Sequence, residues 1–276
     1  MKRASGINKV ILGERIDIAQ FMAVCRCGAE VEFSPEYCER VNKARRLVEQ
    51  WVDEERVMYG VTTGFGALCT KAIDKNETAR LQENIIKSHS TSVGQPFEIE
   101  EARAVMLMIL QNLGQGYSGV RLEILEMYRQ FLNRGVTPWA PKEGSVGYLS
   151  PEAHMARTIS GLGKAYYGGQ LMDSSEALAK AGLQPLELSY KEGLALVSGT
   201  TSATAMAAIS LYDVMNSALA ADVIAALTLE SSKGIIKAFD ERVMKVRPHS
   251  YQAKTAANVR NILADSEVIE YYKDSR

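Results

Sequence analysis

The chain has 276 residues, of which 46% are hydrophobic, and its 32 Lys and Arg nearly balance its 33 Asp and Glu. This composition excludes a disordered or collagen-like chain, and the net charge of -1 argues against nucleic acid or an anionic membrane as the main partner. We expect a cytoplasmic location, because the N-terminus lacks an apolar signal core and no uncharged apolar run approaches the roughly 20 residues of a membrane span.

The spacing of the four cysteines does not favour a metal site. Cys25 and Cys27 are separated by a single residue, which is tighter than the usual zinc-binding pair, and the three histidines lie far along the chain. We therefore expect reduced thiols and no metal.

The first half of the chain is predicted to be mostly helical after a short extended start. The first 35 residues indicate short extended pieces and turns. Ser34 and Pro35 then provide an N-cap and a first-turn proline for a helix that runs to about Val57. Further helices are predicted at about 76–89, 99–112 and 119–133.

A glycine-rich segment follows the helix that ends at about Val57. It reads Tyr59-Gly60-Val61-Thr62-Thr63-Gly64-Phe65-Gly66 and is predicted to be a loop. The glycines would allow a ligand to approach the backbone closely. A dinucleotide site is disfavoured because no clear strand precedes the loop. A second loop is predicted at 136–151, which holds three of the seven prolines.

The most informative stretch for architecture runs from Thr200 to Lys233. It contains no Pro or Gly and only four charged residues. As one helix it would be roughly 50 Å long, and its apolar residues cover most of its circumference, so it should be packed on nearly all sides. The rest of the chain offers few long helices to surround it, which indicates neighbours from another chain. A last helix is predicted at 251–264.

Several short motifs follow the glycine loop in a characteristic order. They are Gln82-Glu83-Asn84, Ser88-His89-Ser90, the segment 115–121, Gly144-Ser145-Val146-Gly147, the segment 191–196 and Arg247-Pro248-His249. In this order and spacing the chain resembles the aromatic amino acid lyase family, which includes histidine and phenylalanine ammonia-lyases. The likeness runs from about residue 10 to the C-terminus.

The resemblance implies a mainly α-helical fold, with an N-terminal globular part followed by the long helices of a central bundle. We expect an N-terminal catalytic-type domain at 1–198 and the first bundle helices at 199–276. The resemblance also implies a tetramer, in which residues from several chains form each active site. The chain stops where the family continues into a second half that supplies further substrate-binding groups, so we expect a second subunit carrying that half, although a truncated fragment is the other interpretation.

One departure from the family affects its prosthetic group. Family lyases cyclise an Ala-Ser-Gly triad into the electrophile methylidene-imidazolone, within Gly-Ser-Val-Gly-Ala-Ser-Gly-Asp-Leu-Ala-Pro-Leu-Ala-His. This chain reads Gly-Ser-Val-Gly-Tyr-Leu-Ser-Pro-Glu-Ala-His over 144–154. A three-residue gap removes the triad and places Tyr148 where the following Asp would be. We expect no such cofactor here, and Ala4-Ser5-Gly6 is interpreted as a chance match in a frayed tail. Ser198 likewise replaces the family's asparagine beside the group.

The resemblance also assigns roles to individual residues. Tyr59 matches the family tyrosine that removes the substrate β-proton, and His89 matches a histidine on the substrate side. A tyrosine hydroxyl has a reference pKa near 10, so such a base needs neighbouring positive charge or strong hydrogen bonds. Gly66, Tyr148 and Ser198 are assigned to substrate binding; Tyr148 either faces a cationic group through its ring or merely fills vacated volume. His154 and His249 are interpreted as structural.

Three functions remain open at this point. The first is elimination of an amine from an amino acid or betaine without the electrophile, as in the similar ergothionases, because a trimethylammonium group leaves without activation. The second keeps ammonia as the leaving group, with activation by the missing partner. The third is a catalytically silent structural or regulatory subunit.

Overall fold

The computed structural model describes residues 4–63, 77–145 and 149–274 of the chain. Two compact units are present, unit 1 over Met1–Ile209 and unit 2 over Ser210–Arg276. The units divide within the long helix, whereas the sequence placed the domain boundary at 198/199, before that helix. The domain assignment itself stays a prediction.

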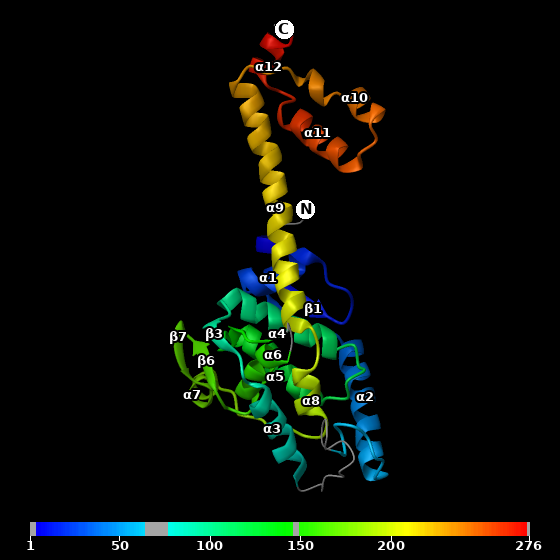
Figure 1. Ribbon diagram of the computed structural model, residues 1–276, viewed down its shortest axis with the longest axis vertical. Helices are drawn as coiled ribbons and strands as arrows, with labels where there is room; N and C mark the ends of the chain where they lie inside the picture. Colours follow the sequence, from blue (N-terminus) through cyan, green and yellow to red (C-terminus); the bar gives the residue numbers. More distant parts are fainter. Residues whose placement is uncertain (1–3, 64–76, 146–148, 275–276) are drawn as a thin grey trace. The chain divides into compact units, whose positions relative to one another are not determined.

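The fold is mainly α-helical, as predicted (Figure 1). The helices are α1 Ile18–Cys27, α2 Pro35–Asp53, α3 Thr78–His89, α4 Ile99–Leu113, α5 Leu122–Arg134, α6 Ser150–Ile159, α7 Ser174–Lys180, α8 Glu192–Val197, α9 Thr201–Ser231, α10 Glu241–Val246, α11 Ser250–Ile262 and α12 Glu267–Tyr272, with 3-10 turns η1 Ala4–Gly6 and η4 Ile236–Phe239. The strands are β1 Lys9–Leu12, β2 Glu30–Phe33, β3 Val93–Pro96, β4 Thr137–Pro138, β5 Pro141–Glu143, β6 Lys164–Tyr167 and β7 Gln170–Asp173.

Helix α4 is the centre of the unit 1 core. It packs against α1 and α5, and residues from Ala102 to Leu107 along it are all buried. Arg103 is buried too, yet its guanidinium donates to the Val24 and Leu132 carbonyl oxygens near the ends of α1 and α5. Because helix C-termini carry partial negative charge, these carbonyls are suitable partners for a buried cation. In Figure 1 the β4–β6–β7 sheet and α7 lie on one side of α5 and α6, and α2 lies on the other.

The expectation of only extended pieces and turns before residue 35 is wrong. The segment contains α1, which begins at a capping box: the Asp17 carboxylate accepts from the Gln20 N–H at 2.8 Å, and the Gln20 side chain accepts from the Asp17 N–H. A polar residue followed three positions later by Glu or Gln is the sequence signature of this cap. Gly28 closes the helix in the left-handed conformation, after which β2 pairs in parallel with β1.

Two further segments differ from the predictions. Residues 136–151 are not a plain loop, because they contain β4 and β5, which pair with β6 and β3, and the first turn of α6. The Ala4-Ser5-Gly6 segment is not frayed but forms η1, with Ala4 buried against α1.

The predicted long helix is present as α9. Within unit 2 its Ala226 packs with Val259, Leu263 and Ile269 in a small core, while Val214 and Ile224 are 65% and 62% exposed. By length and apolar composition alone, the segment Glu192–Ser231 could cross a membrane. A single such helix is weak evidence, because core helices of soluble assemblies have the same composition.

Candidate active site

Tyr59 lies on a turn shortly after the end of α2. Hydrogen bonds of the Thr62 side chain hold this turn. The Thr62 hydroxyl accepts from the Met58 N–H at 2.8 Å and donates to the Arg56 carbonyl at 2.6 Å. Gly60 adopts a φ of 68°, a conformation that favours glycine. The Tyr59 side chain is 57% exposed, so the turn presents its ring at the surface of the unit.

The same turn is fixed to the core by its neighbouring side chains. Val61 is buried against Val48 and Val52 of α2, and Met58 and Tyr190 pack on this cluster. Tyr190 lies two residues before α8. The Tyr59 turn is therefore held between α2 and the start of α8.

His89 is the last residue of α3 and is half-buried. Its Nδ1 lies 2.8 Å from the Ile85 carbonyl oxygen. A carbonyl oxygen only accepts, so Nδ1 carries the proton. In this tautomer Nε2 is the acceptor of the ring, and no hydrogen bond to it comes from the described part of the chain. This tautomer suits a histidine that receives a hydrogen bond from a ligand.

Helix α8 holds α3 through a close contact at Gly193. The Gly193 N–H donates to the Gln82 side-chain oxygen at 2.8 Å, and a Cβ on Gly193 would meet the Gln82 carbonyl oxygen at 2.5 Å. Only glycine fits such an approach. Since His89 ends α3 and Ser198 follows α8, this contact couples the helices that carry two of the predicted site residues.

The start of α8 is anchored by a buried ion pair. The Glu192 carboxylate, fully buried, accepts from the Arg121 guanidinium at 2.8 Å and from the Arg121 backbone N–H at 3.0 Å. It also accepts from the Ser189 N–H. Removing either partner of such a pair leaves an uncompensated buried charge. The pair therefore fixes α8 relative to α5.

Ser198 is the exposed C-cap residue of α8. Gly199 follows with a φ of 133°, and a Cβ there would lie 3.2 Å from the Asn112 amide nitrogen. Next to this turn lies a cleft of about 520 Å³ between the end of α4 and the start of α9. The described residues that line it are uncharged: Met108, Gln111, Asn112, Gln115, Gly199, Thr200, Thr201 and Thr204.

The segment after His89 is tied to the start of α6. The Ser150 hydroxyl oxygen accepts from the Thr91 N–H at 3.0 Å, and from the Ser92 N–H and hydroxyl at 2.8 Å each. Ser150 lies two residues after Tyr148. Tyr148 and Gly66 themselves lie outside the described residues, so their predicted roles stay predictions. The same holds for a shared cavity between Tyr59 and His89.

His154 is buried on α6, where its ring meets Trp139 edge-on. Burial, reinforced by the charge of Arg157, lowers the pKa of His154 to about 4. The imidazole is therefore neutral at physiological pH. This environment agrees with a structural role.

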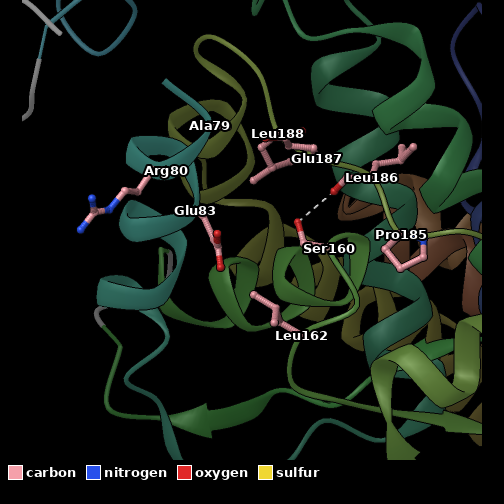
Figure 2. A pocket seen from close by; sticks show the side chains of 9 residues that line it. All are labelled: Ala79, Arg80, Glu83, Ser160, Leu162, Pro185, Leu186, Glu187 and Leu188. Atoms are coloured by element: carbon pink, nitrogen blue, oxygen red, sulfur yellow. Dashed lines mark hydrogen bonds between the residues drawn. The ribbon is translucent and has the colours of Figure 1, made fainter. Parts of the chain in front are cut away.

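A separate pocket of about 450 Å³ lies at the N-terminal half of α3 (Figure 2). Its walls come from Ala79, Arg80 and Glu83 on α3, from Ser160 and Leu162, and from Pro185–Leu188. The Ser160 hydroxyl donates to the Leu186 carbonyl at 3.1 Å, as the dashed line shows. None of the predicted site residues is among these lining residues.

The sequence analysis missed one buried charged residue, which lies next to the start of α9. Glu152 on α6 is only 1% exposed, and it bonds the first turn of α9. The signal was available, because Glu152 is a carboxylate at the position where the family motif has a leucine.

Comparison with known proteins gives a consistent result. The sequence model of the aromatic amino acid lyase family matches residues 16–276. Histidine ammonia-lyase 1 of Fusobacterium nucleatum is 46% identical over 266 residues, which are 95% of this chain and 52% of that protein. The chain thus spans about half the length of the curated relatives it matches.

Solved structures agree with this comparison. Ergothionase from Treponema denticola, in complex with desmethyl-ergothioneine sulfonic acid, has a TM-score of 0.85 at 30% identity, over 91% of this chain and 51% of its own. Histidine ammonia-lyase from Trypanosoma cruzi has a TM-score of 0.86 at 32% identity, over 91% of this chain and 49% of its own.

Proposed function

The chain belongs to the aromatic amino acid lyase family, and on that premise we propose that it is one part of a carbon–nitrogen lyase that works without methylidene-imidazolone. Its substrate is an aromatic or histidine-like amino acid or betaine, and the leaving group is ammonia or trimethylamine. The observation that carries this proposal is the combination of a family fold, Tyr59 and His89 on elements held by α8, and a triad-free segment at 144–151.

The elimination needs one base and one leaving group. The phenolate form of Tyr59 takes the β-proton of the substrate and becomes the phenol, the C–H electron pair forms the carbon–carbon double bond, and the C–N bond breaks so that its electron pair leaves with the nitrogen. With Nδ1 of His89 held by the Ile85 carbonyl, Nε2 accepts a hydrogen bond from the substrate and orients it. No oxidant or additional reactant is consumed.

The leaving group decides whether an electrophile is needed. A trimethylammonium group departs as neutral trimethylamine, and it carries no N–H through which an adduct with a prosthetic group would form. Ergothionase, an ergothioneine-degrading enzyme, is among the structural neighbours at 30% identity, which is compatible with a betaine substrate. We therefore favour a betaine over a primary amino acid.

The residues present do not fit the family's prosthetic group. The segment 144–151 has no Ala-Ser-Gly, and the hydroxyl of Ser150 is engaged by the Thr91 and Ser92 backbone. The other triad, Ala4-Ser5-Gly6, is a 3-10 turn against α1. No step of the proposed reaction uses the group.

We further propose a second subunit that supplies the remaining half of the fold, in a cytoplasmic, tetramer-like assembly. The support is the apolar surface of α9, where Val214, Ile224 and Leu227 are each more than half exposed. Exposed apolar patches of this kind mark protein interaction sites.

The test is to assemble the chain with a subunit carrying the C-terminal half and to measure amine release from a panel of amino acids and their betaines. Trimethylamine released from a betaine is the expected result. Release of ammonia alone would favour partner-assisted activation. A well-formed complex that turns over no member of the panel would instead identify a silent structural or regulatory subunit.

A further inference from the structure

Glu152, which lies on α6, accepts hydrogen bonds from the first turn of α9. One carboxylate oxygen accepts from the Thr201 hydroxyl at 2.8 Å and from the Ser202 N–H at 2.9 Å. The first N–H groups of a helix lack partners within it and carry partial positive charge. The carboxylate thus acts as a cap, although it comes from α6 rather than from the chain just before α9.

The second carboxylate oxygen is not used by this cap. Oε2 of Glu152 is buried and has no hydrogen-bond partner among the described residues, and the same is true of the Tyr128 hydroxyl on α5. Burial, reinforced by the negative charge of Glu152, raises the pKa of Tyr128. The phenol is therefore neutral and lies within the field of the carboxylate. Glu152 forms no ion pair with any residue that the structure describes.

This arrangement holds more negative charge than a cap requires. A helix N-terminus provides about half a unit of positive charge, and neutral Ser, Thr or Asn side chains cap helices as well as Asp does. A buried carboxylate without a full cationic partner is costly. Its persistence here is best explained by a positive charge that arrives from outside the chain.

The cleft beside Ser198 shares a residue with this cap. Thr201 both lines this cleft and donates to Glu152, so one hydroxyl separates the carboxylate from the cleft wall. No Lys, Arg, Asp or Glu is among the described residues that line it. Ser198 lies three residues before Thr201, at most about 11 Å along an extended chain. Thr201 therefore links the carboxylate to the cleft, and the described walls of the cleft provide no charge that would compete with it.

We propose that Glu152 is a specificity-determining residue that makes the cleft at the start of α9 select a cationic amine, the ammonium or trimethylammonium end of the substrate. This assignment rests on the proposed function for the identity of that cation as the leaving group. The cleft's amide and hydroxyl groups surround the cation, while Glu152 provides the charge.

The proposed role has a kinetic signature. Breaking the C–N bond removes the positive charge from nitrogen, so a fixed anion stabilises the bound substrate more than the transition state. Loss of the Glu152 charge should therefore raise KM and leave kcat unchanged or higher. A residue that merely supports the fold would lower kcat when it is changed.

The test uses the assembled complex and two probes of equal shape, choline and its uncharged carbon isostere 3,3-dimethylbutan-1-ol. Glu152→Gln keeps an oxygen that can accept from Thr201 and Ser202 but removes the charge. We expect the wild-type complex to bind choline more tightly than the isostere by on the order of tenfold, and Glu152→Gln to abolish that preference. Glu176→Gln, which removes an equal charge from the exposed face of α7, should retain it.

The outcomes separate the inference from the proposed function. Loss of the preference in Glu152→Gln supports the inference even if no amine is ever released, in which case the lyase proposal alone is overturned. Amine release with an undiminished preference in Glu152→Gln overturns the inference alone. A wild-type complex that shows no preference for choline also overturns it. Hydrogen exchange of the first turn of α9 verifies that Glu152→Gln retains the fold.

Discussion

Unit 1 and unit 2 manage their apolar side chains in opposite ways. Unit 1 buries large residues such as Tyr37, Leu107 and Phe131 completely. Among the described residues, none of the largest fully buried side chains comes from unit 2. Among the described residues, thirteen exposed large apolar side chains fall in unit 2 against eight in unit 1, although unit 2 is much the shorter. The difference indicates that unit 1 has an extensive core of its own, while unit 2 leaves much of its apolar surface exposed.

The largest expected contrast comes from placing a charge in each unit. Leu107→Asp puts a carboxylate into the centre of α4 and should lower the free energy of unfolding by on the order of 5 kcal/mol. Ile224→Asp, at an exposed site, should change it by no more than about 0.5 kcal/mol but prevent assembly with a second subunit. Urea unfolding and size-exclusion chromatography measure the two effects. Normal assembly of Ile224→Asp would remove the distinction between the units.

A second prediction sharpens the description of unit 1. Gly193→Ala introduces a Cβ at 2.5 Å from the Gln82 carbonyl oxygen, so α3 and α8 must separate, and the free energy of unfolding should fall by about 3 kcal/mol. Gly6→Ala is the matched control, because nothing lies within 4 Å of its Cβ. Equal stability of the two variants in urea would contradict the close packing on which the placement of His89 and Ser198 depends.

The third prediction concerns pH and the unit 1 core. Burial depresses the pKa of His154 to about 4 from a reference value of 6.5, so between these values the unfolded chain binds the proton and the folded chain does not. The stability of the fold should therefore fall as the pH drops through this window, by on the order of 2 kcal/mol from this residue.

His154→Gln should remove that part of the pH dependence, and His249→Gln, at an exposed position, should leave it unchanged. Unfolding in urea at pH 7 and pH 4.5 provides the comparison. Identical pH profiles for the wild type and His154→Gln would show that His154 does not lie in an apolar core.

The sequence predicted the elements that have strong periodicity. Helices α2 to α5 and α9 carry apolar residues at helical spacing with recognisable ends, and the structure confirms them within a few residues. Helix α1 was missed even though Asp17 and Gln20 form its capping box. Local pattern and cap signals are thus sufficient for most of this fold, provided that short helices between strands are also considered.

The candidate site was harder to predict, because its organisation depends on contacts between distant residues. The family motifs identify Tyr59, His89 and Ser198, but the approach of Gly193 to Gln82 spans 111 residues. The bond from Thr201 to Glu152 likewise spans 49 residues and follows no periodicity. Such contacts are set by how helices pack, which the order of residues alone does not specify.

The most direct test of the central claim is the kcat of the assembled complex for amine release when the Tyr59 hydroxyl is removed. The account predicts that Tyr59→Phe lowers kcat at least about 100-fold, the usual contribution of a positioned base. Tyr117→Phe, a matched change at a side chain that is 88% exposed, should leave kcat unchanged. Equal turnover by the two variants would contradict the claim that this chain provides the base for an elimination without the prosthetic group.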